Sequence, residues 1–137
     1  MYTYHKDGQI PLNGEIFVFG SNLAGIHGAG AAKEAYHRFK ARFWVGEGPT
    51  GQSYAIPTKD MQIATRPIDE VAESIRKFQE YAASRPDLQF YITRVGCGLA
   101  GFLDKQIAPL FKGSTENCIF PEEWRQYLEH QQDKADD

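Results

Sequence analysis

Apolar and polar positions change their spacing several times along the chain, and each change predicts an element of structure. Short, largely apolar runs predict strands buried on both faces, as in a parallel sheet covered by helices. These runs are Ile16–Phe19, Ser53–Pro57, Leu88–Thr93 and Asn117–Phe120. Because proline cannot donate to a ladder, Pro57 is expected at the end of its strand.

Apolar residues recur at three- and four-residue spacing elsewhere, which predicts amphipathic helices. One helix is expected to begin near Ala29, and its apolar positions are Ala32, Ala35, Tyr36, Phe39 and Phe43. A longer one is expected between Pro67 and Arg85, with apolar positions Ile68, Val71, Ala72, Ile75, Phe78 and Ala82. A short helix is predicted at Leu103–Phe111, and a terminal one from Pro121, in which Trp124 and Leu128 cover the sheet.

The remaining segments are expected to be connections or edges. Residues 1–14 form an N-terminal arm or an edge strand, and Asn13 with Gly14 is a strong turn signal before the strand at Ile16. Arg42–Val45 is expected to form a brief strand, and the glycine- and proline-rich residues 46–51 a loop. The polar tail, residues 130–137, is expected to fray.

Strands and helices alternate along the whole chain, which is typical of an α/β protein whose crossover helices return parallel strands to one sheet. We therefore predict a single three-layer α/β/α domain over residues 1–137, with a mixed, mostly parallel sheet. Ligands of such sheets bind beyond the carboxyl ends of the strands. Two glycine-rich loops each follow a predicted strand, so both are expected on that side.

Length and charge narrow the classes of function. A chain of 137 residues is in the usual range of one domain, and a net charge of −3 does not indicate a nucleic-acid partner. No apolar run is long enough to span a membrane, and the N-terminus lacks a signal peptide, so a cytoplasmic protein is expected. Cys97 and Cys118 do not form a metal-binding spacing, so we expect reduced thiols, no metal and no cofactor.

The two glycine-rich loops are the candidate chemistry. The first reads GSNLAGIHGAGAA from Gly20 to Ala32, and the second reads RVGCGLAGF from Arg94 to Phe102. Glycines let backbone N–H groups approach a ligand closely, and a helix N-terminus favours a phosphate. Neither standard phosphate loop is present, because Lys33 stands where a third glycine would be needed and no glycine precedes Lys-Ser or Lys-Thr.

Together these segments resemble the macro domain family, which binds ADP-ribose, and more closely its small phage and bacterial macro-like branch. The resemblance runs from about Ile16 to Phe120. FGSN at Phe19–Asn22 is similar to the strand end whose asparagine faces the distal ribose, and His27–Ala32 resembles the first ligand loop. Arg94–Phe102 is similar to the loop that wraps the diphosphate and ends in an aromatic near that ribose, and Gly51–Thr58 resembles the strand between them.

The candidate site residues come from these segments. Asn22 and His27 are the catalytic candidates; Asn22 could instead be only a turn residue, and His27 a solvated loop residue with an exposed neighbourhood. The expected ligand-binding residues are Gly20, Ser21, Asn22, Leu23, Ala24, Gly25, Gly28, Ala29, Gly30, Ala31, Thr58, Val95, Gly96, Cys97, Gly98, Leu99, Ala100, Gly101 and Phe102. Cys97 as a nucleophile has no base that the sequence identifies, and packing of a small side chain is the alternative. Phe102 is either core or an aromatic at the edge of the site.

The expected function is binding of ADP-ribose or a related ADP-ribosyl nucleotide, with hydrolysis of a group on the distal ribose as an open extension. Hydrolysis would remove the phosphate from ADP-ribose 1''-phosphate or release ADP-ribose from an ADP-ribosylated macromolecule. Hydrolytic members often carry an aspartate after the first-loop glycines, where this chain has Ala31 and Ala32, and the adenine-recognising aspartate has only Asp7 or Glu15 as candidates. A non-catalytic nucleotide-binding module and a structural interaction domain are the alternatives.

Overall fold

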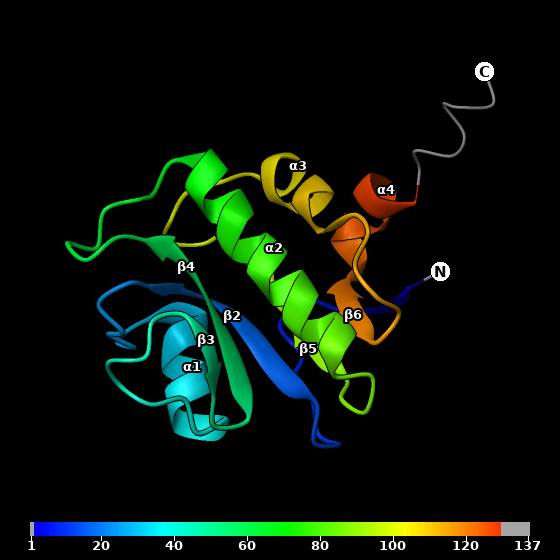
Figure 1. Cartoon of the computed structure of the whole chain (residues 1–137), viewed down its shortest axis with the longest axis horizontal. Helices are drawn as coiled ribbons and strands as arrows, with labels where there is room; N and C mark the ends of the chain where they lie inside the picture. Colours follow the sequence, from blue (N-terminus) through cyan, green and yellow to red (C-terminus); the bar gives the residue numbers. More distant parts are fainter. Residues whose placement is uncertain (1, 130–137) are drawn as a thin grey trace.

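A computed structural model describes residues 2–129, in which six strands form one mixed sheet of order β1-β6-β5-β2-β4-β3 (Figure 1). The strands are β1 (Thr3–His5), β2 (Ile16–Asn22), β3 (Gly48–Thr50), β4 (Ser53–Lys59), β5 (Phe90–Ile92) and β6 (Cys118–Pro121). The helices are α1 (Gly30–Arg38), α2 (Ile68–Ser84), α3 (Asp104–Ile107) and α4 (Arg125–Leu128), with 3-10 turns η1 (Ala108–Phe111) and η2 (Glu122–Trp124). Every pair of neighbouring strands is parallel except β3 and β4, which confirms the predicted α/β class.

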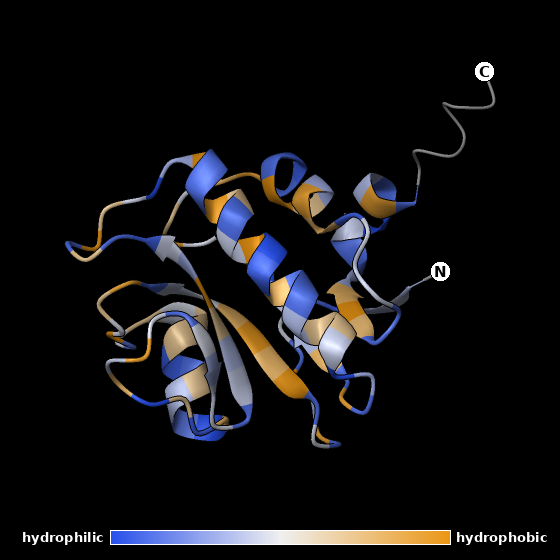
Figure 2. Cartoon of the chain, in the orientation of Figure 1, coloured by the Kyte–Doolittle hydropathy of each residue, from blue (hydrophilic) through white to orange (hydrophobic). Residues whose placement is uncertain are grey.

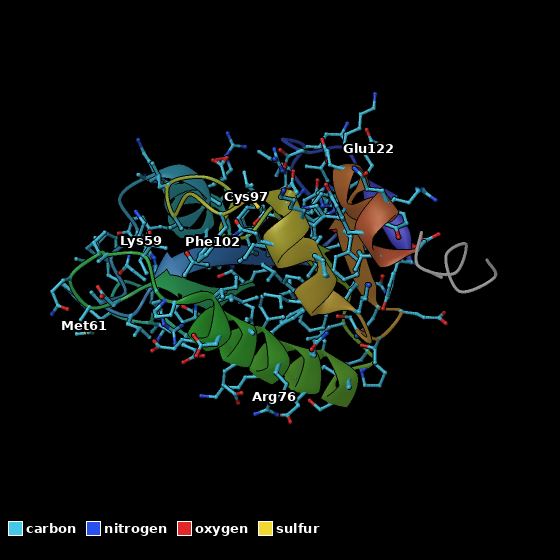
Figure 3. All side chains as sticks on the ribbon, turned by 90° about the horizontal axis from the view of Figure 1, so that it is seen from above. Lys59, Met61, Arg76, Cys97, Phe102 and Glu122 are labelled. Atoms are coloured by element: carbon cyan, nitrogen blue, oxygen red, sulfur yellow. The ribbon has the colours of Figure 1, made fainter. Side chains whose placement is uncertain are left out.

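Helices cover both faces of this sheet, so the domain has three layers (Figures 1 and 3). Alternate residues of the central strand β2 point to opposite faces. Phe17 and Phe19 pack with α1, whereas Val18 packs in the larger cluster under α2. All three are 4% exposed or less, as expected for a strand buried on both sides. Figure 2 shows the same contrast, with hydrophobic colours along β2 and hydrophilic colours on the outer side of α2.

The larger core lies between the sheet and α2. The helix buries four positions of the predicted stripe, Val71, Ile75, Phe78 and Ala82. Ile68, its first residue, is exposed instead, and Ala72 is only half-buried. Asp69 and Glu70 in the first turn complement the positive end of the helix. Fully burying one aliphatic or aromatic side chain of this kind contributes about 1.5–3 kcal/mol. Trp124 and Leu128 from the C-terminal turns also enter this core, as predicted.

The first helix ends earlier than its apolar spacing suggests. α1 stops at Arg38, because Lys40 takes a left-handed backbone with φ 60°, so Phe43 is not part of it. The brief strand expected at Arg42–Val45 is wrong: these residues form a turn in which the N–H of Trp44 donates to the Gly25 carbonyl at 2.8 Å. This loop contact, remote in sequence, replaces the ladder that a strand would need.

The segment of residues 46–51, expected to be a loop throughout, is also a correction, because β3 lies within it. β3 pairs antiparallel with β4, and Pro49 lies opposite Tyr54. β3 is an edge strand, where a residue without an N–H is tolerated. β4 likewise continues past Pro57 to Lys59, with an irregularity in the ladder between Ser21 and Asn22 of β2.

The N-terminal arm adopts one of its two expected forms. β1 is an edge strand that pairs parallel with β6, so Thr3 lies opposite Ile119. The short helix expected at 103–111 divides into α3 and η1, with Pro109 in the 3-10 turn. None of the helices in residues 2–129 has the length and hydrophobicity that a membrane crossing requires. The fraying predicted for residues 130–137 falls outside the described residues.

Candidate functional site

The two glycine-rich loops meet because β2 and β5 are neighbouring parallel strands. Their carboxyl ends lie at the same edge of the sheet, as predicted. The first residues of the two loops lie so close together that a Cβ on Gly20 would be 3.2 Å from the backbone nitrogen of Gly96. A cleft of about 720 Å³ opens between the loops, the start of α1 and the N-terminal arm. Its volume is within the usual range for small-molecule sites, about 300–1,000 Å³.

The start of α1 supplies backbone donors to this cleft. The residues that lead into α1 and begin it, Gly28 to Ala32, line the cleft, and the N-cap residue Ala29 makes no side-chain capping hydrogen bond. The N–H groups of a first helical turn have no acceptor within the helix. They therefore present donors and the positive end of the helix dipole to the cleft, an arrangement suited to a phosphate.

The second loop presents a similar surface from the opposite side. Gly98, Leu99 and Ala100 line the cleft, and their N–H groups have no acceptor within residues 2–129. A Cβ built on Gly28 or on Gly98 has no atom within 4 Å, so both glycines face open space. The loops are near each other there, since a Cβ on Gly30 would lie 4.0 Å from Leu99 Cδ1.

Most of the residues predicted for the site line the cleft. They are Gly20, Ser21, Asn22, Gly28, Ala29, Gly30, Ala31, Thr58, Gly96, Cys97, Gly98, Leu99 and Ala100. The predicted residues that lie outside its lining are Leu23, Ala24, Gly25, His27, Val95, Gly101 and Phe102.

Packing explains several of these outlying positions. Gly25 has φ +74°, and a Cβ there would lie 2.4 Å from the Trp44 backbone, so this glycine permits the contact between two loops. Val95 is 1% exposed in the larger core, and Phe102 packs against that core. Phe102 also supports the second loop from below, because its N–H donates to the Gly96 carbonyl at 2.9 Å. In Figure 3 the second loop passes above Phe102, with Cys97 beside it.

Asn22 lines the cleft, yet its amide also closes its own loop. Its Nδ2 donates to the Ile26 carbonyl at 2.8 Å, and its Oδ1 accepts the Ile26 N–H at 3.0 Å. The side chain is buried, and each bond uses only part of the capacity of an amide, which has two donor hydrogens and two acceptor lone pairs. Asn22 can thus hold the loop and still bond a ligand.

His27 lies in a setting opposite to the one expected. The residue is 2% exposed, so the exposed neighbourhood predicted for it is wrong. Its ring lies edge-on between Phe19 and Phe43, and Nε2 lies 2.7 Å from the Arg42 carbonyl. Nε2 therefore carries the hydrogen, while Nδ1 is buried without a partner among the described residues. This contact ties the first loop to the segment after α1.

A charged cluster at the start of the second loop anchors this loop. Asp104 accepts two hydrogen bonds from Arg94, at 3.0 and 2.7 Å, and one from Trp124 Nε1 at 2.8 Å. Burial alone would raise the pKa of Asp104, but these bonds hold it below its ordinary value. Burial, together with the Asp104 carboxylate, raises the pKa of the Cys97 thiol to about 12. Cys97 is therefore a protonated thiol at neutral pH, which favours packing over nucleophilic attack.

The N-terminal arm forms a wall of the cleft that sequence reasoning missed. Its lining residues are His5, Asp7, Gly8, Gln9 and Ile10. The arm is held on the sheet by a stacked pair, since the rings of His5 and Tyr91 lie 3.8 Å apart, and by the Tyr91 hydroxyl, which donates to the Gln9 carbonyl at 2.8 Å. The Asp7 carboxylate forms an ion pair with Arg94, in which Oδ2 lies 3.4 Å from Nη1. In the sequence, Asp7 within a polar, turn-rich arm was the only feature that connected this segment with the site.

The remaining lining residues come from the sheet and the loops beside it. They are Phe17, Ile26, Ala32, Glu34, Lys59, Ile63, Tyr91, Thr93 and Arg94. Phe17 and Tyr91 form an aromatic floor, with ring centroids 6.5 Å apart. Within residues 2–129, no group of three or more His, Cys, Asp or Glu side chains could hold a metal ion.

The fold and the cleft define a three-layer α/β/α domain with an open site at the carboxyl ends of its central parallel strands. A scan against protein-family models and a search of curated protein sequences gave no match. Among solved structures, the chain is similar to a protein of unknown function from Bacteroides thetaiotaomicron, with a TM-score of 0.59 and 15% sequence identity. The similarity covers 88% of this chain and 97% of the other, and it supports the fold alone.

Proposed function

We propose that this protein is a macro-like domain that binds ADP-ribose or a closely related ADP-ribosyl nucleotide in the cleft. The observation that carries the proposal is the meeting of two sets of backbone donors across one cavity. One set is the uncapped start of α1, and the other is the loop at Gly98–Ala100. A diphosphate between them would accept from both, as an anion does at a helix N-terminus and in a nest of N–H groups.

Different strands carry the polar groups of the cleft, which suggests an orientation for the proposed ligand. Asn22 lines the cleft where β2 pairs with β4, and its partly available amide would bond hydroxyls of the distal ribose. The N-terminal arm lines the cleft against Tyr91 of β5, and there the Asp7 carboxylate would accept from the amino group of adenine. This assigns to Asp7, rather than Glu15, the role that the resemblance leaves open.

Binding without turnover is the form of this function that the side chains support better. The first loop has alanines where a hydrolytic aspartate would stand, His27 is bonded to the Arg42 carbonyl, and Cys97 is protonated. None of these groups is arranged as a general base toward the cleft. Hydrolysis on the distal ribose stays a prediction, which a turnover assay with ADP-ribose 1''-phosphate tests.

The binding proposal is tested by filling the diphosphate space. Gly28→Val and Gly98→Val place side chains where a Cβ meets no atom within 4 Å, so each should fold normally. Each should weaken ADP-ribose binding by about 100-fold or more in calorimetry, because the side chain occupies ligand space and blocks the N–H donors. Ala83→Val on the exposed side of α2 is the control and should leave binding unchanged. Unchanged affinity in both glycine variants, with unchanged melting temperatures, would remove these loops from the site.

A further inference from the structure

A series of aromatic rings leads from the core to the surface beside the first loop. The ring of Phe43 contacts buried His27 edge-on, with ring centroids 5.4 Å apart. It also makes edge-to-face contacts with Tyr36 of α1 at 4.7 Å and with Trp44 at 6.0 Å. Tyr36 is 44% exposed and Trp44 is 76% exposed. A tryptophan so open to water is unusual, because this residue type is highly buried on average, as Trp124 is in the same chain.

The turn that carries Trp44 has a rigid and strained backbone. The N–H of Arg42 donates to Thr50 Oγ1 at 2.8 Å, and its carbonyl lies 2.7 Å from His27 Nε2. Lys40 has φ 60° and Trp44 has φ 76°, left-handed conformations that cost free energy for residues with bulky side chains. Glycine or asparagine would form the same turn with less strain. Strain of this kind is concentrated at functional sites, so an exposed tryptophan here indicates a role outside the fold.

Cations without partners lie in the same turn. Residues 35–46 contain three cations and no carboxylate, although the whole chain has a net charge of −3. Arg38 is neutralised by Glu34, since the two side chains form an ion pair at 3.0 Å. Lys40 and Arg42 are exposed, and within residues 2–129 neither of them forms an ion pair. The local charge is therefore opposite in sign to that of the whole chain.

The helix before this turn extends the positive surface. Lys33 is exposed and precedes Tyr36 by three residues on α1, so the two side chains are neighbours on one face of the helix. α1 lies on the face of the sheet opposite α2 (Figures 1 and 3). The residues that we call the α1 surface are Lys33, Tyr36, Lys40, Arg42 and Trp44. None of these five residues is among those that line the cleft.

We propose that the α1 surface binds single-stranded nucleic acid, with a base stacked on Trp44 and phosphates beside the three unpaired cations. Exposed aromatic rings among lysines and arginines are the usual components of such surfaces, because every base has a flat face and every linkage a charge. An acidic peptide would use the cations but has no flat group for the indole. A membrane surface would need a larger apolar area than one exposed tryptophan supplies. The proposal is independent of the function of the cleft.

The emission of the two tryptophans tests the stacking directly, because Trp44 is exposed and Trp124 is fully buried. The probe is a single-stranded oligothymidylate of about 12 nucleotides, which carries no adenine for the cleft to recognise. At about 50 mM salt it should quench the Trp44 emission of the parent protein. Trp44→Asn, which suits the left-handed turn, should show no quenching and a melting temperature no lower than that of the parent. Its affinity, measured by fluorescence anisotropy of a labelled probe, should be about 5- to 100-fold weaker, as for the loss of one base stack.

Salt dependence tests the contribution of the cations. For three phosphates contacted on a single strand, the logarithm of the binding constant should fall with the logarithm of salt concentration with a slope of about −2. The double variant Lys40→Asn with Arg42→Gln should reduce this slope to about −0.7, because one contact remains. Lys77→Gln, at an exposed position of α2 on the opposite face of the sheet, is the matched control and should behave as the parent.

Several results would overturn the proposal. They are no binding of the probe by the parent at low salt, unchanged affinity in Trp44→Asn, and displacement of the probe by saturating ADP-ribose, which would place it in the cleft. Binding of a polyglutamate peptide or of anionic phospholipid vesicles in place of the oligonucleotide would assign the surface to another partner and equally refute it. If Trp44→Asn does not fold, the slope of the double variant decides. Calorimetry with ADP-ribose on the same samples tests the cleft separately, so either function can fail without the other.

Discussion

Asn22 should contribute to stability as well as to binding, and Asn22→Ala separates the two contributions. The substitution removes two hydrogen bonds to Ile26, at 2.8 and 3.0 Å, at a side chain that is 8% exposed. Each neutral bond contributes about 0.5–1.5 kcal/mol, so the loss should be about 1–3 kcal/mol of unfolding free energy. The upper part of this range is expected if the N–H of Ile26 stays buried without an acceptor.

Urea denaturation followed by circular dichroism measures this loss directly. The dependence of the unfolding free energy on urea concentration should stay the same, while the urea concentration at the midpoint should fall. This combination indicates a change in stability alone. Asn22→Asp keeps an acceptor for the Ile26 N–H but loses the donor to the Ile26 carbonyl. Its unfolding free energy should therefore lie between those of the parent and Asn22→Ala, reduced further by repulsion between the carboxylate and that carbonyl. Asn13→Ala, at an exposed position, is the matched control and should change stability by less than about 0.5 kcal/mol.

Binding to Asn22→Ala gives the second half of the test. If the amide also bonds a ribose hydroxyl, ADP-ribose affinity should fall by about an order of magnitude or less. Stability unchanged to within 0.5 kcal/mol would refute the loop-closing role. Unchanged affinity together with reduced stability would refute the ribose contact and leave Asn22 as a purely structural residue.

Two further predictions follow from the buried groups around the loops. His27→Ala should lower the unfolding free energy by about 2–4 kcal/mol in urea denaturation, because it leaves a cavity between Phe19 and Phe43 and frees the Arg42 carbonyl. Stability equal to that of the parent would contradict this structural role of His27. Asp104→Asn should cost about 2–4 kcal/mol and weaken the acid dependence of stability, measured by urea denaturation between pH 2 and pH 7. Since the pKa of folded Asp104 is below its unfolded value of 3.8, its stabilisation is present above that pH and is lost as pH falls through the folded pKa. An equally steep loss of stability in Asp104→Asn would show that other carboxylates control the acid limb.

The amino-acid sequence by itself determined the class of fold and most of the central elements. β5 lies within its predicted apolar run, and β2 and β4 begin at the first residue of theirs and extend beyond them. α2 buries most of the predicted stripe. These elements depend on local periodicity, which any short segment carries within itself. The same reasoning placed both glycine-rich loops on one side of the sheet, because loops that follow parallel strands leave the sheet at the same edge.

Tertiary structure alone decided the edges, the burial of single side chains and the walls of the cleft. β3 exists because β4 offers it a ladder, although its Gly-Pro sequence indicates a loop. His27 is buried because the segment after α1 folds over it, and no local pattern records that contact. The N-terminal arm and Lys59 enter the cleft through pairings with β6 and β2. Such pairings join residues far apart in the chain, so they depend on which surfaces meet and not on the spacing within either segment.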